Sequence, residues 1–196
     1  MNYRNAKLIL ASGSPRRRSI LEMAGHLQEV RVSSADEETT ETVPDRLVEE
    51  LSKRKAYDVA REVEDGIVLG ADTVVACGGE ILGKPADEED AKRMLERISG
   101  RAHEVCTGVT LVCKEGGTVR WTETFHEVTK VFVSPLSDEE IDEYVNTGEP
   151  LDKAGAYGIQ GYFGKHIGRI EGDYFNVVGL PAAAVYERLK KRRDEI

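Results

Sequence analysis

The sequence predicts an α/β fold, because stretches with the pattern of buried strands alternate with stretches that carry the apolar face of a helix. Three observations support this prediction. Residues 8–18 pass from an apolar run, through a small polar turn, into the start of a helix. Residues 66–75 form the most apolar segment and follow an amphipathic helix. Residues 103–133 have the β-branched and aromatic content of two long antiparallel strands around the turn Gly116-Gly117.

The first element is a strand that runs into a helix N-terminus. After the apolar residues 8–11, Ser14 is placed to cap a helix, and Pro15 occupies its first position, where the missing N–H costs nothing. The free N–H groups and the positive dipole end of such a terminus favour an anion. Arg16 and Arg17 stand beside it and offer planar forks that match phosphate oxygens. The alternative is an ordinary strand–helix junction with solvated arginines.

The segment after this helix predicts a strand and an acidic loop. Gly25 ends the helix, and residues 27–33 are expected to form a second strand. Residues 35–42 are rich in acidic residues and threonine. Either they form a solvated connection, or one carboxylate folds over a metal–phosphate group.

A helix is expected over residues 44–61, and one lysine lies on its apolar face. Lys55 follows Leu51 by four residues, so both point to the same side. A lysine in an apolar stripe either extends to the edge of the buried surface or reaches a buried anion. Both alternatives stay open at this point.

The apolar strand over residues 66–75 is interrupted by Asp72. An ionised carboxylate in such a strand is costly unless it is paired, hydrogen-bonded or bound to a metal. Gly70 leaves room for the close approach of backbone or ligand. The alternative places Asp72 at a strand end. Residues 78–79 then predict a hairpin turn, and Lys84 follows the returning strand, either as a surface lysine or as part of a site.

Two further helices carry clear end signals. Asp87 is expected to cap a helix over residues 87–99, whose apolar residues recur with helical spacing and which Gly100 ends. Ser137 and Glu140 form a capping box at the start of a shorter helix. We assign both helices a structural role.

The stretch 149–161 is rich in glycine, which makes it a poor element interior but a good wall for a ligand. Within it, Gln160 carries both a donor and an acceptor that can read the edge of a base. Residues 163–170 and 174–178 are expected to form short strands, and the last helix begins near Leu180-Pro181.

Length and composition bound the class of protein. The 196 residues can bury a sizeable core, and the net charge of −9 argues against a general affinity for nucleic acid. We find no apolar run of membrane-spanning length and no signal-peptide core in residues 1–7. The three cysteines lack metal-site spacing and indicate free thiols. We therefore expect a cytoplasmic protein with neither nucleic-acid nor membrane partners.

Five motifs, in this order along the chain, resemble the Maf family of nucleoside triphosphate pyrophosphatases. They are Ala-Ser-Gly-Ser-Pro-Arg-Arg at 11–17, Gly-Ala-Asp-Thr at 70–73, Gly-Lys-Pro at 83–85, the glycine-rich stretch 148–161, and Asp-Tyr-Phe-Asn-Val-Val-Gly-Leu-Pro at 173–181. Each motif alone is weak, whereas the ordered set is specific and covers nearly the whole chain.

The resemblance implies a single domain over residues 1–196 with a fold like that of inosine triphosphatases. That fold is an elongated mixed β-sheet flanked by helices, with two lobes around a central cleft. The resemblance also implies a divalent metal, Mg or Mn, and a homodimer. Ala-Gly-Ala-Tyr-Gly-Ile-Gln-Gly at 154–161 looks like the subgroup that acts on dTTP and UTP.

The resemblance also assigns roles to residues. It implies that Asp72 is the general base and a metal contact, and that Glu37 helps to hold the metal. Arg16, Thr73 and Gln160 would be tied to the choice of nucleotide. The residues that it implies in substrate binding are Ser14, Arg16, Arg17, Lys55, Thr73, Lys84 and Gln160.

The implied reaction is the hydrolysis of dTTP and UTP, with modified pyrimidine nucleotides as further candidates. Water attacks the α-phosphorus, and the products are the nucleoside monophosphate and pyrophosphate. The alternative is a nucleotide-binding regulator of cell division with little catalysis. A P-loop NTPase is disfavoured because the motif Gly-x-x-x-x-Gly-Lys-Ser/Thr does not occur.

Overall fold

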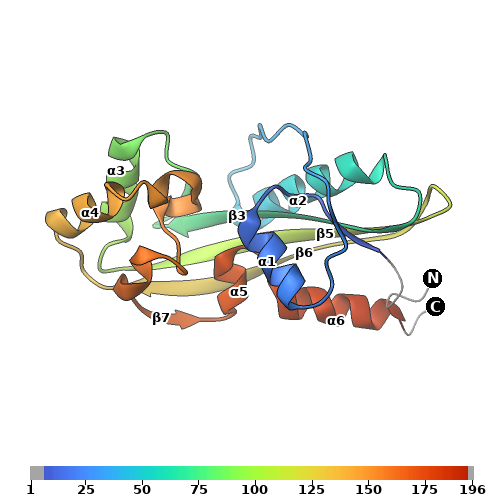
Figure 1. Cartoon of the computed structure of the whole chain (residues 1–196). Coiled ribbons are helices and arrows are strands. Elements are labelled where there is room, and N and C mark those ends of the chain that lie inside the picture. Colours follow the sequence, from blue (N-terminus) through green and yellow to red (C-terminus); the bar gives the residue numbers. More distant parts are fainter. Residues whose placement is uncertain (1–6, 194–196) are drawn as a thin grey trace. The chain divides into compact units, whose positions relative to one another are not determined.

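The computed structural model describes residues 7–193, which form a mixed sheet with helices around it (Figure 1). The strand order is β2-β1-β3-β5-β6-β7, and β4 pairs with β3. The strands are β1 (Leu8–Leu10), β2 (Glu29–Val30), β3 (Gly66–Cys77), β4 (Glu80–Leu82), β5 (Ala102–Glu115), β6 (Thr118–Val133) and β7 (Ile167–Glu171). The helices are α1 (Pro15–Met23), α2 (Pro44–Ala60), α3 (Glu88–Ile98), α4 (Asp138–Val145), α5 (Tyr174–Val178) and α6 (Ala182–Arg193), with 3₁₀ turns η1 (Glu149–Asp152), η2 (Ala154–Ala156) and η3 (Tyr162–His166).

The described chain divides into two compact units. Unit 1 comprises residues 7–72, 107–127 and 179–193, and unit 2 comprises residues 73–106 and 128–178. Each unit has its own buried core, so each is described separately below.

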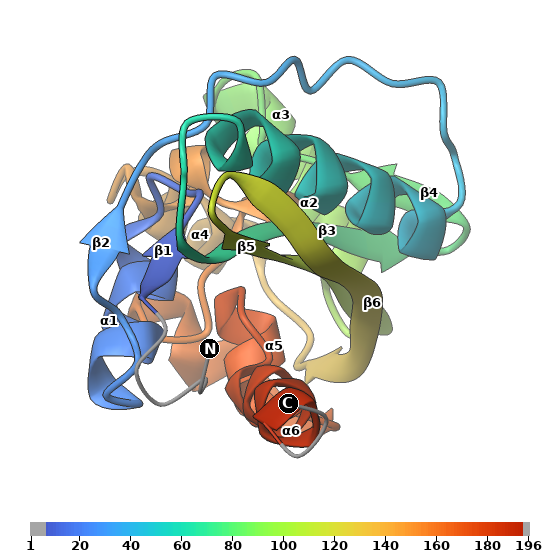
Figure 2. The same cartoon turned by 90° about the vertical axis from the view of Figure 1, so that its right-hand side faces the viewer.

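In unit 1, β1 pairs in parallel with both β2 and β3. Figure 2 shows α2 and α6 on opposite faces of the strands of this unit. Two glycines let α2 lie close to the sheet. A Cβ on Gly70 would lie 2.3 Å from the backbone oxygen of Ser52, and one on Gly108 would lie 2.3 Å from that of Val48. Helix α2 is therefore pressed onto β3 and β5 with no room for side chains at these two crossings.

In unit 2, β3 turns into β4 and β6 pairs antiparallel with β7. Gly78 and Gly79 both have positive φ, as the predicted two-residue hairpin requires. The core is formed by α3, α4 and a cluster of aromatic rings, of which Tyr144 and Phe163 are each 1% exposed.

Both predicted helix caps are confirmed. Asp87 precedes α3, and its Oδ1 accepts from the backbone N of Asp90 at 2.8 Å. At the start of α4, Ser137 and Glu140 make both bonds of the capping box. These caps satisfy N–H groups that a helix leaves without partners at its start.

The strand expected over residues 27–33 is largely wrong, because only Glu29–Val30 is a strand. Its partner β1 has three residues, so few positions are available for pairing. Just beyond, the hydroxyl of Ser33 and the backbone N of Ser34 each donate to Asp58 on α2 at 2.8 Å. The chain is therefore tied to a helix where a strand was expected.

The two short strands expected near the C-terminus are also partly wrong. Residues 163–166 belong to a 3₁₀ turn, and only Ile167–Glu171 is extended. Residues 174–178 form helix α5. Asp173 is the reason, because its Oδ1 accepts from the backbone N of Phe175 at 2.8 Å and its carbonyl accepts from Val177 at 3.3 Å.

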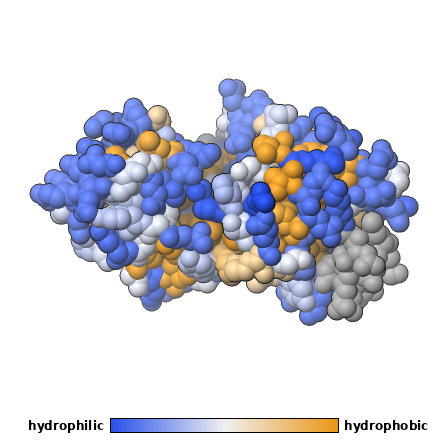
Figure 3. Space-filling view, in the orientation of Figure 1, coloured by the Kyte–Doolittle hydropathy of each residue, from blue (hydrophilic) through white to orange (hydrophobic). Residues whose placement is uncertain are grey.

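Hydrophilic residues cover most of the face shown in Figure 3. Within residues 7–193, we find no helix with both the length and the apolar character needed to cross a bilayer.

Candidate active site

The predicted strand–turn–helix stretch opens the site in unit 1. Ser14 is the N-cap of α1, and its Oγ accepts from the backbone N of Arg17 at 3.5 Å. Pro15 occupies the first turn of the helix. The sequence forms this cap because serine satisfies an N–H group that would otherwise lack a partner, and proline has no N–H to satisfy.

Arg17 is held in a fixed direction at this turn. Its Nε donates to the carbonyl of Gly179 at 2.8 Å, and its Nη1 donates to Ser12 Oγ at 3.1 Å. Burial lowers the pKa of Arg17, whereas the charge of Asp72 raises it and the charge of Arg16 lowers it further. An arginine stays protonated despite such a shift, so this guanidinium is a permanent, oriented positive charge.

A lysine and two carboxylates also meet in unit 1. Lys55 Nζ lies 2.7 Å from Asp72 Oδ1 and 3.0 Å from Glu37 Oε1. The side chains of Lys55 and Asp72 are each 12% exposed, whereas that of Glu37 is 63% exposed. Of the two alternatives for Lys55, the structure therefore supports the buried anion. Glu37 brings the acidic loop onto the same ammonium group.

The charges of this cluster act on one another. Arg17 is influenced by Arg16, Asp72 and Glu37, and Lys55 contacts both carboxylates. Three cations therefore share one region with two carboxylates. Such a group can hold a polyanion through the cations while it keeps a carboxylate beside it as a base.

The carboxylates also fit one kind of metal. Asp72 and Glu37 each place an oxygen within 3.0 Å of the same nitrogen, so they lie close together and supply hard oxygen ligands. Among the described residues there is no group of three or more acidic, histidine or cysteine side chains that forms a metal cage. This donor set suits an ion such as Mg²⁺, which keeps several waters and takes phosphate oxygens as ligands.

The other residues expected at the site belong to unit 2. Thr73 follows Asp72 in β3, and Lys84 follows β4 as an exposed side chain. Gln160 is exposed between η2 and η3. The backbone N of Gly155 donates to the carbonyl of Gly83 at 3.0 Å, which joins the Lys84 segment to the glycine-rich segment.

Sequence reasoning missed two groups that hold Arg17, namely Ser12 and the carbonyl of Gly179. Both lie inside motifs whose other residues carry the sequence prediction. A small serine at the end of a strand and a backbone carbonyl have no chemical signature in a sequence, so only the folded chain reveals these contacts.

Comparisons with known proteins agree with this picture. The family model described as "Maf-like protein" matches residues 7–192. A protein of Lachnoclostridium phytofermentans named "dTTP/UTP pyrophosphatase" is 50% identical over 94% of each chain. One of Agathobacter rectalis with the same name is 47% identical over 95% of this chain and 97% of its own.

A solved structure supports the predicted fold. The HAM1 protein from Coxiella burnetii aligns with a TM-score of 0.51 over 97% of this chain and 100% of its own, at 15% identity. That likeness concerns the fold alone, and it agrees with the mixed sheet that the resemblance implied. The family model and the near-half identity to full-length relatives go further, and they show that this chain belongs to the Maf-like protein family.

Proposed function

We propose that this chain is a nucleoside triphosphate pyrophosphatase that hydrolyses dTTP and UTP to the nucleoside monophosphate and pyrophosphate. The observation that carries the proposal is the buried pair of Lys55 and Asp72, joined by Glu37, in a chain half identical to a relative of that name. A buried carboxylate beside several cations is suited to bringing water and a polyphosphate together.

In the proposed reaction, Asp72 accepts the proton of a water molecule that attacks the α-phosphorus. The bond between this phosphorus and the oxygen that bridges to the β-phosphorus breaks, and pyrophosphate leaves. Negative charge grows on the leaving oxygens, so fixed cations lower the barrier. Arg16, Arg17 and Lys55 supply this charge, while the Ser14 hydroxyl, at the positive end of the α1 dipole, donates to a phosphate oxygen.

We propose Asp72 and Glu37 as ligands of a divalent cation, Mg or Mn. When bound, such an ion acidifies a coordinated water and neutralises phosphate charge. Lys55 contacts both carboxylates and offsets one of their two negative charges, which keeps the pair close together in the protein alone.

We further propose, from the family resemblance, that Lys84 contacts the phosphates and that Arg16, Thr73 and Gln160 set the choice of nucleotide. The side chain of Gln160 is exposed and offers the donor and acceptor that reading a base edge needs. The same resemblance supports a homodimer. A cytoplasmic location is supported by the three cysteines, which are buried and form no disulfide. They are Cys77, Cys106 and Cys113.

A nucleotide panel tests the proposal. The purified chain is incubated with Mg²⁺ and each of dTTP, UTP, CTP, dATP and GTP, and pyrophosphate, orthophosphate and nucleotide products are measured. We expect pyrophosphate and monophosphate from dTTP and UTP, and a stop when a chelator is added. Nucleotides that bind and remain intact would instead indicate a binding regulator, and orthophosphate with a diphosphate product would contradict attack at the α-phosphorus.

A further inference from the structure

The glycine-rich segment of unit 2 is held on both sides of Gln160. The backbone N of Gly158 donates to the hydroxyl of Tyr144 at 3.3 Å. The backbone N of Tyr162 donates to Glu149 Oε2 at 3.0 Å. Gln160 lies midway between these two anchors, and its side chain is exposed. The backbone on both sides of Gln160 is therefore held by hydrogen bonds, while Gln160 itself is exposed.

The two anchoring side chains are also joined to each other. The hydroxyl of Tyr144 donates to Glu149 Oε1 at 3.0 Å, so the two carboxylate oxygens hold different partners. Burial, followed by the charge of Glu149, raises the pKa of Tyr144, which keeps its hydroxyl protonated as a donor. Lys153 Nζ donates to the backbone carbonyl of Glu149 at 2.6 Å and fixes the residue from another side.

The glycines of the segment lie directly against these groups. A Cβ on Gly161 would lie 2.0 Å from Glu149 Oε1, and one on Gly158 would lie 2.6 Å from Lys153 Cε. Gly161 has φ −102°, which other residues also adopt, so a larger residue here is opposed by the Glu149 carboxylate, which would have to move aside. A side chain at either glycine would therefore displace Lys153 or Glu149 from the position that it takes beside the segment.

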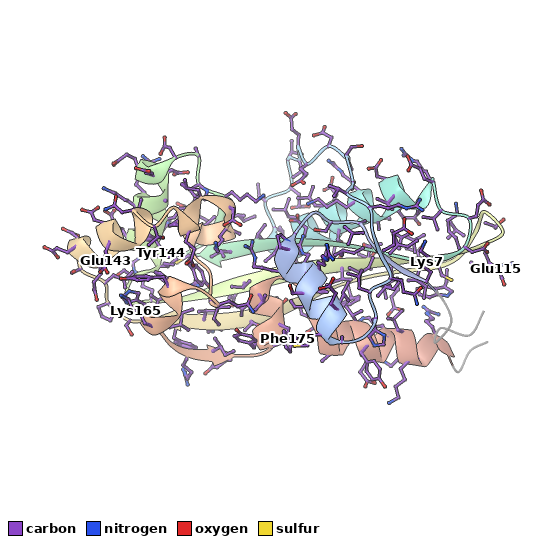
Figure 4. All side chains as sticks on the ribbon, viewed as in Figure 1. Lys7, Glu115, Glu143, Tyr144, Lys165 and Phe175 are labelled. Carbon is purple, nitrogen blue, oxygen red and sulfur yellow. The ribbon has the colours of Figure 1, made fainter. Side chains whose placement is uncertain are left out.

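Helix α4 carries the residues that hold the segment beyond Gln160 (Figure 4). The rings of Tyr144 and Tyr162 stack with centroids 6.1 Å apart. The hydroxyl of Tyr162 donates to Glu143, and Lys165 Nζ lies 3.9 Å from the centre of the Tyr162 ring. The chain beyond Gln160 is thus secured to the same helix that carries Tyr144.

We propose that Glu149, together with Tyr144, is a positioning residue that fixes the backbone around Gln160 and thereby sharpens the choice of base. This inference rests on the proposed function, in which Gln160 reads the nucleotide. An amide discriminates between bases only when its donor and acceptor are held in one direction, and a loosened backbone lets it adapt to several. Neither anchoring side chain needs to touch the substrate.

The test uses Glu149→Ala and Tyr144→Phe, with Glu96→Ala as a control at an exposed glutamate of α3 in the same unit. For each protein, kcat/KM is measured for dTTP, UTP, CTP and GTP with Mg²⁺. Hydrogen exchange of the Gly158 and Tyr162 amides is measured without nucleotide. We expect both variants to exchange these amides faster. We also expect the ratio of kcat/KM for dTTP or UTP to that for CTP or GTP to fall by about fivefold, which corresponds to the free energy of one typical hydrogen bond. The control should change neither property.

Gly161→Ala tests the same idea without removing the carboxylate. Its added methyl group must displace either Glu149 or the segment, so the preference should narrow in the same direction. If active variants keep the wild-type ratios, or lose activity equally on every nucleotide, Glu149 does not position the specificity residue. If the wild-type chain hydrolyses no nucleotide, the proposed function itself fails. If the wild type is active and the variants keep its ratios, only the role of Glu149 fails.

Discussion

Lys55 shows how one side chain links the fold to the chemistry. Its Nζ contacts Asp72 at 2.7 Å and Glu37 at 3.0 Å, and it is 12% exposed. Its position within an apolar stripe made it a candidate, because a buried ammonium needs an anion nearby. Asp72 is a candidate for the corresponding reason, because a carboxylate in an apolar strand needs a cation or another partner nearby. The contact between Lys55 and Asp72 is therefore the part of this candidate site that the sequence indicates most clearly, because each charge breaks an apolar pattern.

The Lys55→Met variant should lose both stability and activity. Removing the lysine leaves the Asp72 carboxylate buried without this partner, and breaking a buried pair in that way costs about 3 kcal/mol. Urea unfolding measures the stability, and pyrophosphate release measures the activity. Lys53→Met, at an exposed lysine of the same helix, should stay within about 0.5 kcal/mol of wild type. Equal effects of the two substitutions would contradict the assigned role of Lys55.

The Arg17→Lys variant tests whether orientation matters beyond charge. Arg17 donates from Nε to Gly179 and from Nη1 to Ser12, and an ammonium group cannot hold both directions at once. We expect the KM for dTTP to rise about tenfold, in line with the loss of a hydrogen bond to a charged group.

Arg18→Lys is the matched control for that variant. Arg18 is exposed and pairs with Glu22 one turn further along α1, at 2.7 Å. Its replacement should change the KM by less than about twofold, because exposed ion pairs contribute little. A KM for Arg17→Lys that equals that of the control would show that the fixed direction of Arg17 is unimportant.

At the scale of elements, α2 carries Lys55 to β3, which carries Asp72. Glycines make this possible, since Gly70 and Gly108 leave no space between the helix backbone and the sheet. The sequence indicated the helix and the strand, because each has a clear local pattern. It also indicated that Gly70 leaves room for backbone or a ligand to approach the strand closely. It did not indicate that the partner at Gly70 is α2, because contacts between distant segments leave no local pattern.

The Gly70→Ala variant should push α2 away from β3. The added Cβ would lie 2.3 Å from the backbone oxygen of Ser52, and a helix backbone cannot give way as a flexible side chain can. We expect a loss of about 3 kcal/mol in unfolding free energy and a lower kcat. Gly168→Ala is the control, because its Cβ meets only ordinary contacts at 3.9 Å. A Gly70→Ala protein as stable and active as this control would contradict the packing argument.

Helix α5 shows where element prediction fails. Its residues, Tyr174–Val178, include neighbouring valines and aromatic rings that favour a strand. The cap from Asp173 and the buried Asn176, whose Nδ2 donates to the carbonyl of Val105 at 3.0 Å, hold the segment as a helix. Long elements with a regular apolar pattern were predicted correctly, whereas five residues offer too little pattern to outweigh a cap and a distant contact.

At the scale of the whole molecule, the order of strands lies beyond sequence reasoning on residues alone. Strand β1 pairs with β2 and with β3, although β3 begins more than fifty residues after β1 in the chain. The family resemblance supplied the mixed sheet, and the structure confirms it. The two compact units each contain segments from separate parts of the chain, so no change in composition marks a boundary.

Stability should depend on pH through His103. Burial lowers its pKa to about 4, from 6.5 in an exposed histidine, and its Nε2 shares a hydrogen bond of 2.7 Å with the hydroxyl of Tyr157. The folded protein therefore favours neutral His103. This contribution is complete above pH 6.5 and is lost as the pH falls toward 4, because the unfolded chain then binds a proton that the folded chain does not.

We expect His103 to account for about 2–3 kcal/mol of the stability lost between pH 7.5 and 4.5. Denaturant unfolding of the wild type and of His103→Gln at several pH values measures this share. The wild-type curve should fall more steeply as the pH falls. Parallel curves for the two proteins would show that His103 does not titrate as its burial requires.

The role of Asp72 as the general base is tested by comparing the wild type with Asp72→Asn in the release of pyrophosphate from dTTP and UTP with Mg²⁺. Asparagine keeps the size of the side chain but cannot accept the proton of the attacking water. We predict that turnover falls by about 10²-fold or more, as expected for the loss of a general base, while circular dichroism shows a folded protein. Near-normal turnover by the folded Asp72→Asn variant would contradict the account.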